Sequence, residues 1–159
     1  MIEYRKAELS DIEILTQMRI SMLCDETDYS DELKSLLRNN TIQFIKSGFT
    51  EQSFVSWVAV TDNRIVSMGG VNFFSLPPND WCPNGKTAYI GNMYTLPDHR
   101  HQGIATCILT RLVDEAKNRD CQRILLHTSD MGRPLYEKFG FDASPSAMAF
   151  FPFGIIPFA

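Results

Sequence analysis

The 159-residue sequence has no long apolar run, no low-complexity tract and no internal repeat. A membrane-spanning helix needs about 20 apolar residues, and Met1 to Lys6 lack the apolar core of a secretory signal. Positive charge is also scarce, because 15 lysines and arginines face 19 aspartates and glutamates. This balance argues against an electrostatic nucleic-acid surface. We therefore expect a cytoplasmic protein with neither a membrane segment nor a nucleic-acid partner.

The cysteines show no close pairing. Zinc sites and redox motifs use closely spaced cysteines, and disulfide frameworks belong to secreted chains. We therefore predict free thiols and no metal site. A cysteine nucleophile at Cys82 or Cys121 is the alternative, although no neighbouring base supports it. The four positions are Cys24, Cys82, Cys107 and Cys121.

Strand and helix patterns alternate along the chain, whose length and lack of linkers predict a single domain over residues 1–159. We predict helices starting at a capping box over 10–13, over 33–45, over 104–119, and from Ser129 or Asp130 to Gly140. Asp62 to Arg64 predicts a hairpin turn, and Gly69-Gly70 predicts a bulge or the close approach of a ligand. Strands are predicted over 2–8, 54–61, 65–74, 87–95, 123–128 and 147–153.

Residues 96–106 lie between a predicted strand and a predicted helix, and resemble an anion cradle. Small side chains there allow close approach to backbone N–H groups that lack helical partners. The strands at 87–95 and 123–128 flank this helix, so a βαβ unit with parallel neighbouring strands is expected. A ligand belongs at the carboxyl ends of such strands.

An acidic connection follows the first predicted helix. These carboxylates have two interpretations: they attract an amine, or they form a solvated loop and a favourable helix start. The residues are Asp25, Glu26, Asp28, Asp31 and Glu32.

Two separated motifs resemble the signatures of the GNAT superfamily of N-acetyltransferases. The acetyl-CoA motif of that family is Arg or Gln, two residues, Gly, one residue, then Gly or Ala, and Arg100 to Ala105 matches each defined position. Residues 92–97 resemble the approach to that motif. Leu135 to Phe141 resembles the second signature, LYEKxGF. Together these segments cover about a third of the chain.

The resemblance implies an α/β (α+β) fold with a mixed, mostly antiparallel sheet, a central splayed pair of parallel strands and about four flanking helices. It implies acetyl-CoA as co-substrate, without a metal, and direct attack by the amine of a small molecule or peptide. The backbone amides of 101–106 would receive the pyrophosphate, and the strand before them would run beside pantetheine. The implied cofactor-binding residues are Met93, Tyr94, Thr95, Arg100, His101, Gln102, Gly103, Ile104, Ala105, Thr106 and Ser129.

Through its place in the second signature, Tyr136 resembles the general acid of the family. A phenol suits that role, because it is protonated at neutral pH and can donate to the departing sulfur. Two departures from the family pattern stand out. Ser129 replaces a common asparagine, and the strand over 87–95 lacks a carboxylate that many members use as base. The base is left open among Asp25, Glu26, Asp28 and His127, or no side chain at all.

The alternative function is an inactive acyl-CoA sensor. A different nucleotide-binding protein is disfavoured by the absence of a Gly-x-Gly-x-x-Gly or Lys-Ser/Thr phosphate loop. The sequence leaves the acceptor amine open, although the acidic connection slightly favours a cationic one. The apolar tail at 154–159 suggests a homodimer.

Overall fold

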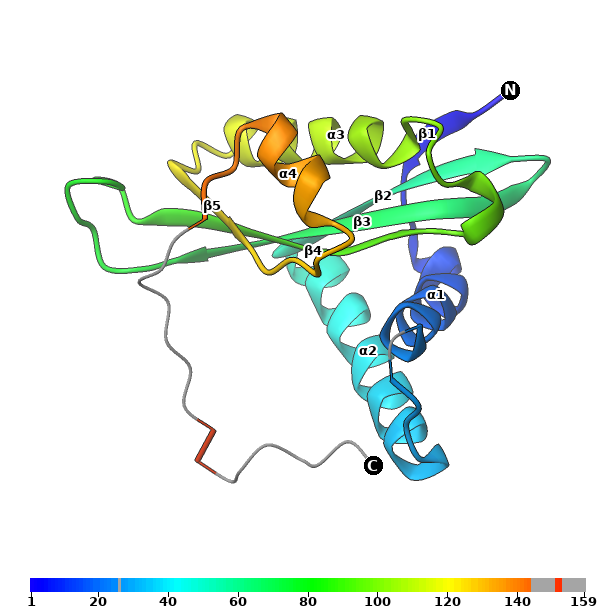
Figure 1. The fold of residues 1–159 in the computed structure, drawn as a ribbon. Helices are drawn as coiled ribbons and strands as arrows, with labels where there is room; N and C mark the ends of the chain where they lie inside the picture. Colours follow the sequence, from blue (N-terminus) through cyan, green and yellow to red (C-terminus); the bar gives the residue numbers. More distant parts are fainter. Residues whose placement is uncertain (26, 144–150, 153–159) are drawn as a thin grey trace.

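The computed structural model describes residues 1–25, 27–143 and 151–152, and shows one sheet with helices on both faces (Figure 1). The five strands follow chain order across the sheet, and the first four pair antiparallel. β4 and β5 pair in parallel, which confirms the expected βαβ unit. The strands are β1 (Glu3–Lys6), β2 (Phe54–Thr61), β3 (Arg64–Ser75), β4 (Lys86–Thr95) and β5 (Arg123–Leu126).

The helices form two layers. Those named α1 and α2 lie below the sheet in Figure 1, whereas α3 and α4 lie above it. The bounds are α1 (Ile12–Cys24), α2 (Asp31–Glu51), α3 (Ile104–Asn118) and α4 (Arg133–Phe139), with short 3₁₀ turns at Leu9–Asp11 and Pro97–His99. This mixed architecture, with its four α-helices in the described residues, confirms the predicted fold class.

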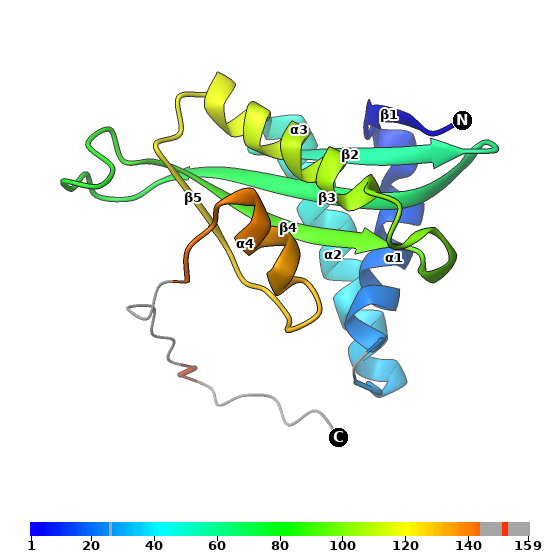
Figure 2. The same cartoon turned by 45° about the horizontal axis from the view of Figure 1, so that its top comes forward.

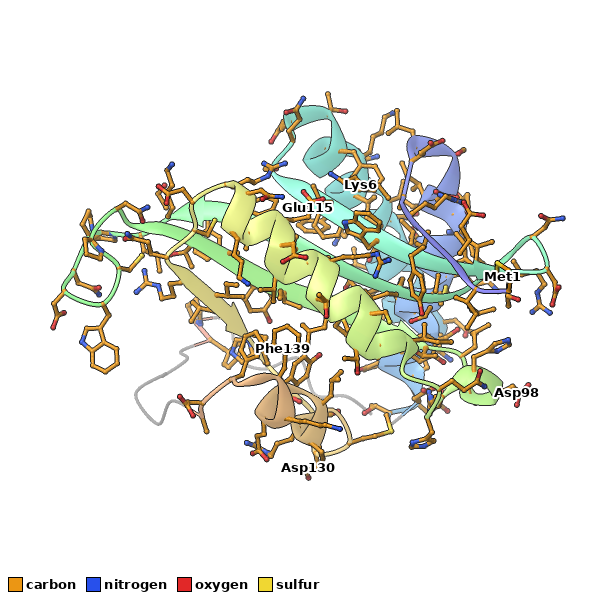
Figure 3. All side chains as sticks on the ribbon, turned by 90° about the horizontal axis from the view of Figure 1, so that it is seen from above. Met1, Lys6, Asp98, Glu115, Asp130 and Phe139 are labelled. Carbon is orange, nitrogen blue, oxygen red and sulfur yellow. The ribbon has the colours of Figure 1, made fainter. Side chains whose placement is uncertain are left out.

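Apolar residues on both faces of the sheet form the core. Ile108, Leu109 and Leu112 of α3 are fully buried against one face, and Leu15 and Ile45 of α1 and α2 are buried against the other. Figure 3 looks down on α3 and shows Lys6 and Glu115 side by side. Their ion pair joins Nζ and Oε1 at 2.6 Å and ties β1 to α3.

The predicted capping box at 10–13 is wrong. The chain makes a 3₁₀ turn whose capping pair lies two residues earlier, and the carboxylate of Asp11 accepts the backbone N–H of Glu8 at 2.8 Å. Arg5 donates to both oxygens of the same carboxylate, at 2.7 and 3.0 Å. Arg5, six residues before Asp11, therefore holds the carboxylate that closes this turn, and the predicted box at 10–13 does not include that contact.

The bulge expected at Gly69-Gly70 lies in the partner strand. Met68 pairs with Tyr94 and Gly70 pairs with Gly91, so β4 carries one more residue than β3 at this point. Asn92 lies in this bulged segment with φ of 55°. Close packing explains the glycine at position 69 instead, because a Cβ on Gly69 would lie 2.5 Å from the sulfur of Met93.

The hairpin between β2 and β3 is confirmed, with Asp62 and Asn63 both at positive φ and Arg64 already in β3. The predicted strand over 147–153 and the tail at 154–159 lie outside the described residues, apart from 151 and 152, which are not in a strand. No helix in the described part of the chain is long and apolar enough to cross a membrane.

Candidate active site

The two parallel strands lie at one edge of the described sheet and separate there. Their pairing runs from Thr87 opposite Arg123 to Ile90 opposite Leu126, and β4 then continues alone to Thr95. Figure 2 shows β5 running away from β4, with α4 beside the gap. The second half of β4 therefore turns backbone hydrogen-bonding groups towards a space that β5 does not fill.

A cavity of about 680 Å³ opens at this separation. Its walls come from α1, α2 and the connection between them, from β2, β3 and β4, and from α4 and the segment that joins β5 to it. A volume of this size accommodates a small molecule. The residues of the predicted site on its wall are Met93, Tyr94, Ser129 and Tyr136.

The predicted anion cradle forms the start of α3. The backbone is left-handed at His101, with φ of 61°, and at Gly103, with φ of 77°. The first amide donating into the helix is that of Cys107, which bonds the Gly103 carbonyl at 3.1 Å. Within the described residues, the amides of 101–106 have no recorded acceptor. Consecutive unpaired amides at a helix start form a site for an anion.

Arg100 braces this turn with its side chain. The guanidinium donates to the Thr95 carbonyl at 2.9 Å and to the Asp25 carboxylate at 3.0 Å, and it lies over the ring of Tyr94. The Thr95 hydroxyl lies 2.7 Å from that of Ser67. Arg100 and Thr95 are therefore engaged with protein groups, which leaves the main chain of the cradle as the available donor set.

Tyr136 lies in the middle of the short helix α4. Pro134 occupies the first turn of this helix, and Gly140, with φ of 113°, caps its C-terminal end. The side chain is 8% exposed and packs edge-on against Phe141. Burial, with a smaller contribution from the phenol of Tyr89, raises the pKa of Tyr136 to about 12. The structure thus holds a protonated phenol at the wall of the cavity.

Ser129 lines the cavity just before α4. Its Oγ accepts the backbone N–H of Gly132 at 3.3 Å, so the hydroxyl supports the entry into the helix. A Cβ on Gly132 would lie 3.3 Å from the ring of Tyr136, which shows how closely this turn packs on the tyrosine.

Sequence reasoning missed Tyr89 as a cavity residue. Its hydroxyl lies 2.8 Å from Nδ1 of His127, across the gap between β4 and the segment after β5. Tyr89 pairs with Leu125 in the parallel ladder, and His127 follows on the same side two residues later. Only the register between the strands reveals this pair.

Arg19 is a second residue that the sequence reasoning overlooked. It follows Leu15 by four residues and precedes Met22 by three, so an arginine interrupts the apolar stripe of α1. That interruption was a usable signal. The structure places Arg19 half-buried on the cavity wall.

No set of three or more His, Cys, Asp or Glu side chains that could hold a metal occurs among the described residues. The four cysteines are free thiols.

The chain is similar to known acetyltransferases in both sequence and fold. The model of the acetyltransferase (GNAT) family matches residues 16–141. A protein of Clostridium acetobutylicum described as a predicted acetyltransferase, solved with acetyl-CoA, is 34% identical, with a TM-score of 0.87 over 94% of this chain and 96% of that one. A GCN5-related N-acetyltransferase of Ralstonia eutropha has a TM-score of 0.85 at 23% identity, over 95% and 99% of the two chains.

Human N-acetyltransferase 8 is 26% identical over 99 residues. This match covers 60% of the chain and 42% of the human protein, so the chain spans less than half of that curated relative. The family model, in contrast, covers α1 from Thr16 onward, β2 to β5 and α2 to α4, and it includes every residue of the cavity wall and of the cradle at 101–106. The chain belongs to the GNAT acetyltransferase family.

Proposed function

We propose that this protein is an N-acetyltransferase that moves an acetyl group from acetyl-CoA to the primary amine of a small molecule or peptide by direct attack. The observation that carries the proposal is the row of unpaired amides at 101–106, next to a gap between parallel strands with Tyr136 on its wall. The Clostridium relative crystallised with acetyl-CoA supports the choice of donor.

The cradle at the start of α3 would bind the pyrophosphate of coenzyme A. Backbone amides and the positive end of the helix dipole both favour a polyanion there. Met93 and Tyr94 would lie beside pantetheine, because β4 beyond Ile90 has no strand partner on its β5 side. An amide of this segment would then polarise the thioester carbonyl.

Tyr136 would act as the general acid. When bound, the thioester supplies an acetyl carbon that the neutral amine attacks, so that a C–N bond forms as the C–S bond breaks. The phenol of Tyr136 donates its proton to the departing sulfur and recovers one from water. Its raised pKa keeps this proton available at neutral pH.

The Tyr89–His127 pair would remove the proton of the acceptor. Asp25 is engaged by Arg100, and Asp28 is exposed and paired with Lys34, so neither carboxylate is free in the cavity. Glu26, another candidate from the sequence, lies outside the described residues. The Tyr89 oxygen would accept the amine proton as its own proton passes to Nδ1 of His127 over 2.8 Å. The exposed imidazole then exchanges with solvent.

The test combines binding and turnover. Purified protein is incubated with acetyl-CoA and a panel of amines, while free thiol and product mass are followed. We expect Tyr136→Phe to bind acetyl-CoA with unchanged affinity by calorimetry and to lose about 100-fold or more in turnover, because only the proton donor is removed.

Tyr4→Phe is the matched control, since Tyr4 lies on β1 and not on the cavity wall. It should retain turnover. If the protein binds acetyl-CoA but acetylates no amine, it is an acyl-CoA sensor and not an enzyme. If it does not bind acetyl-CoA, both the enzyme and the sensor interpretations are refuted.

A further inference from the structure

Arg19 brings an uncompensated positive charge to the cavity wall formed by α1 and α2. In the described part of the chain its guanidinium has no recorded ion pair or hydrogen bond. The other arginines differ, because each contacts a carboxylate, a carbonyl, a hydroxyl or an aromatic ring, apart from Arg64, which is exposed beside the β2–β3 turn. Arg19 is thus a half-buried arginine whose partner is missing from the described protein.

The remaining charges of the cavity do not balance it. Asp25 is the one carboxylate on the described cavity wall, and its oxygens are used by Arg100 at 3.0 Å and by the Tyr94 hydroxyl at 3.5 Å. The imidazole of His127 is engaged by Tyr89. The cavity therefore presents a net positive charge on its α1 side.

The surroundings of Arg19 make this charge costly. Burial lowers the pKa of its guanidinium below the ordinary value, against the opposite effect of the phenols of Tyr89 and Tyr29. A partly desolvated cation without a counter-ion is unfavourable, and a bound anion relieves that cost. The planar guanidinium fits the paired oxygens of a carboxylate or phosphate.

Neutral polar groups complete the same wall. Asn40 and Thr41 of α2 and Asn72 of β3 line the cavity, and no side-chain hydrogen bond is recorded for them in the residues described. Their amide and hydroxyl groups can donate hydrogen bonds to those oxygen atoms of a bound anion that the guanidinium does not contact.

The acidic connection does not supply an opposing cation site. Asp28 has a 97% exposed side chain paired with Lys34, and Asp31 and Glu32 lie in the first turn of α2. None of these three lines the cavity. Asp25 is the one residue of this connection whose carboxylate lines the described wall, and Arg100 already binds it at 3.0 Å. The described wall therefore offers a cationic acceptor, which the composition of the connection slightly favours, no unpaired carboxylate.

We propose that the acceptor is a small primary amine that also carries a carboxylate or phosphate, and that Arg19 binds this anionic group. The proposal rests on the proposed acetyltransferase function. The amine lies towards Tyr89 and Tyr136, and the anion lies towards Arg19, so the arginine selects and orients the acceptor.

The experiment compares amines in matched pairs. Glycine, 4-aminobutyrate and phosphoethanolamine are measured against glycinamide, 4-aminobutyramide and ethanolamine, with spermidine as a polycation. We expect kcat/KM to be about 10- to 100-fold higher for the anionic member of at least one pair, mainly through KM, since one charge-assisted contact distinguishes the two. The carboxylate and phosphate pairs separate the two anion classes.

Arg19→Gln should bring that ratio close to one, and Arg19→Lys should restore part of it. Arg38→Gln is the matched control, because Arg38 is exposed on α2, pairs with Glu13 and does not line the cavity. It should leave the ratio unchanged. A wild-type preference for uncharged or polycationic amines, or an equal loss on all acceptors in Arg19→Gln, would overturn the proposal while leaving the acetyltransferase function intact.

A binding measurement keeps the proposal testable without turnover. With coenzyme A present, an anionic amine should raise the melting temperature of the wild-type protein and should have no such effect on Arg19→Gln. If no amine is acetylated and this difference is seen, the proposed function fails and the anion site stands. If neither amine preference nor the thermal difference is found, the anion site is refuted.

Discussion

Burial raises the pKa of the Tyr136 phenol to about 12, and the neighbouring phenol of Tyr89 adds a smaller increase. Burial has the opposite effect on Arg19: it lowers the pKa of the guanidinium, because loss of water disfavours the charged form, which for arginine is the protonated one. In both residues the displaced pKa reflects desolvation on the cavity wall more than a charged partner. Residue identity therefore sets the charge state at neutral pH, a neutral phenol and a cationic guanidinium, and burial shifts the pKa of each.

The raised pKa of Tyr136 predicts a stability change at high pH. Above the ordinary value of 10 the unfolded chain loses this proton before the folded protein does. Tyr136 stabilises the fold fully below pH 10, and this contribution of about 2–3 kcal/mol is lost as pH rises towards 12. Denaturant unfolding between pH 9 and 12 should show a steeper fall for wild type than for Tyr136→Phe. If the free energy of unfolding falls equally with pH in the two proteins, the raised pKa of Tyr136 is wrong.

At the scale of elements, the start of α3 depends on two left-handed residues, His101 and Gly103. Their conformation turns the chain sharply from the 3₁₀ turn at Pro97–His99 into the helix. The amides of 101–106 are left unpaired as a result. A glycine at 103 is suited to this point because a positive φ disfavours other side chains.

Gly103→Ala should weaken acetyl-CoA binding several-fold with a stability loss of about 1 kcal/mol. A Cβ at this position meets no atom within 4 Å, so the penalty comes from the backbone conformation and not from a clash. Calorimetry with acetyl-CoA and thermal unfolding measure the two effects. Gly103→Asn is the control, because asparagine tolerates left-handed backbone, and equal binding by both variants and wild type would rule out the conformational role.

At the scale of the whole molecule, β5 and α4 are attached to the sheet along a short edge. Only four residue pairs join β5 to β4, and Tyr136, Leu135 and Phe141 contact the core on the α3 side. Residues of this unit and of the helices α1 and α2 line the cavity together. A ligand that fills the gap therefore bridges parts of the fold that are otherwise separated.

Coenzyme A at 100 times its Kd should stabilise the protein by about 2.7 kcal/mol and raise Tm by roughly 5–11 °C. Hydrogen exchange should slow most in β5, α4 and the start of α3, and least in β1. Adenosine 3′,5′-bisphosphate lacks pantetheine and should protect the start of α3 without β5 and α4. Equal protection of β1 and β5 by coenzyme A would show that the ligand does not occupy the gap.

Much of the architecture was predictable from local patterns. Alternating apolar residues located the main strands, helical spacing located the helices, and positive φ at Gly140 agrees with its predicted role as a helix end. The capping of the first turn was not predictable, because Arg5 and Asp11 meet only after β1 and the 3₁₀ turn have packed. The bulge in β4 was assigned to the wrong strand, since glycine spacing does not indicate which partner carries the extra residue.

The sequence by itself determined the order of strands and helices and the glycine-containing turn at 100–105, because each depends on neighbours within a few residues. It also indicated the parallel β4–β5 unit through the strand–helix–strand order, and Tyr136 through its motif. The tertiary structure alone decided that Arg100 meets Asp25, 75 residues away, and that Tyr89 meets His127 across the gap. It also decided that Arg19 faces the cavity without a described counter-ion. Strand register and helix packing set these contacts, and both are fixed only when distant segments bury their apolar faces together.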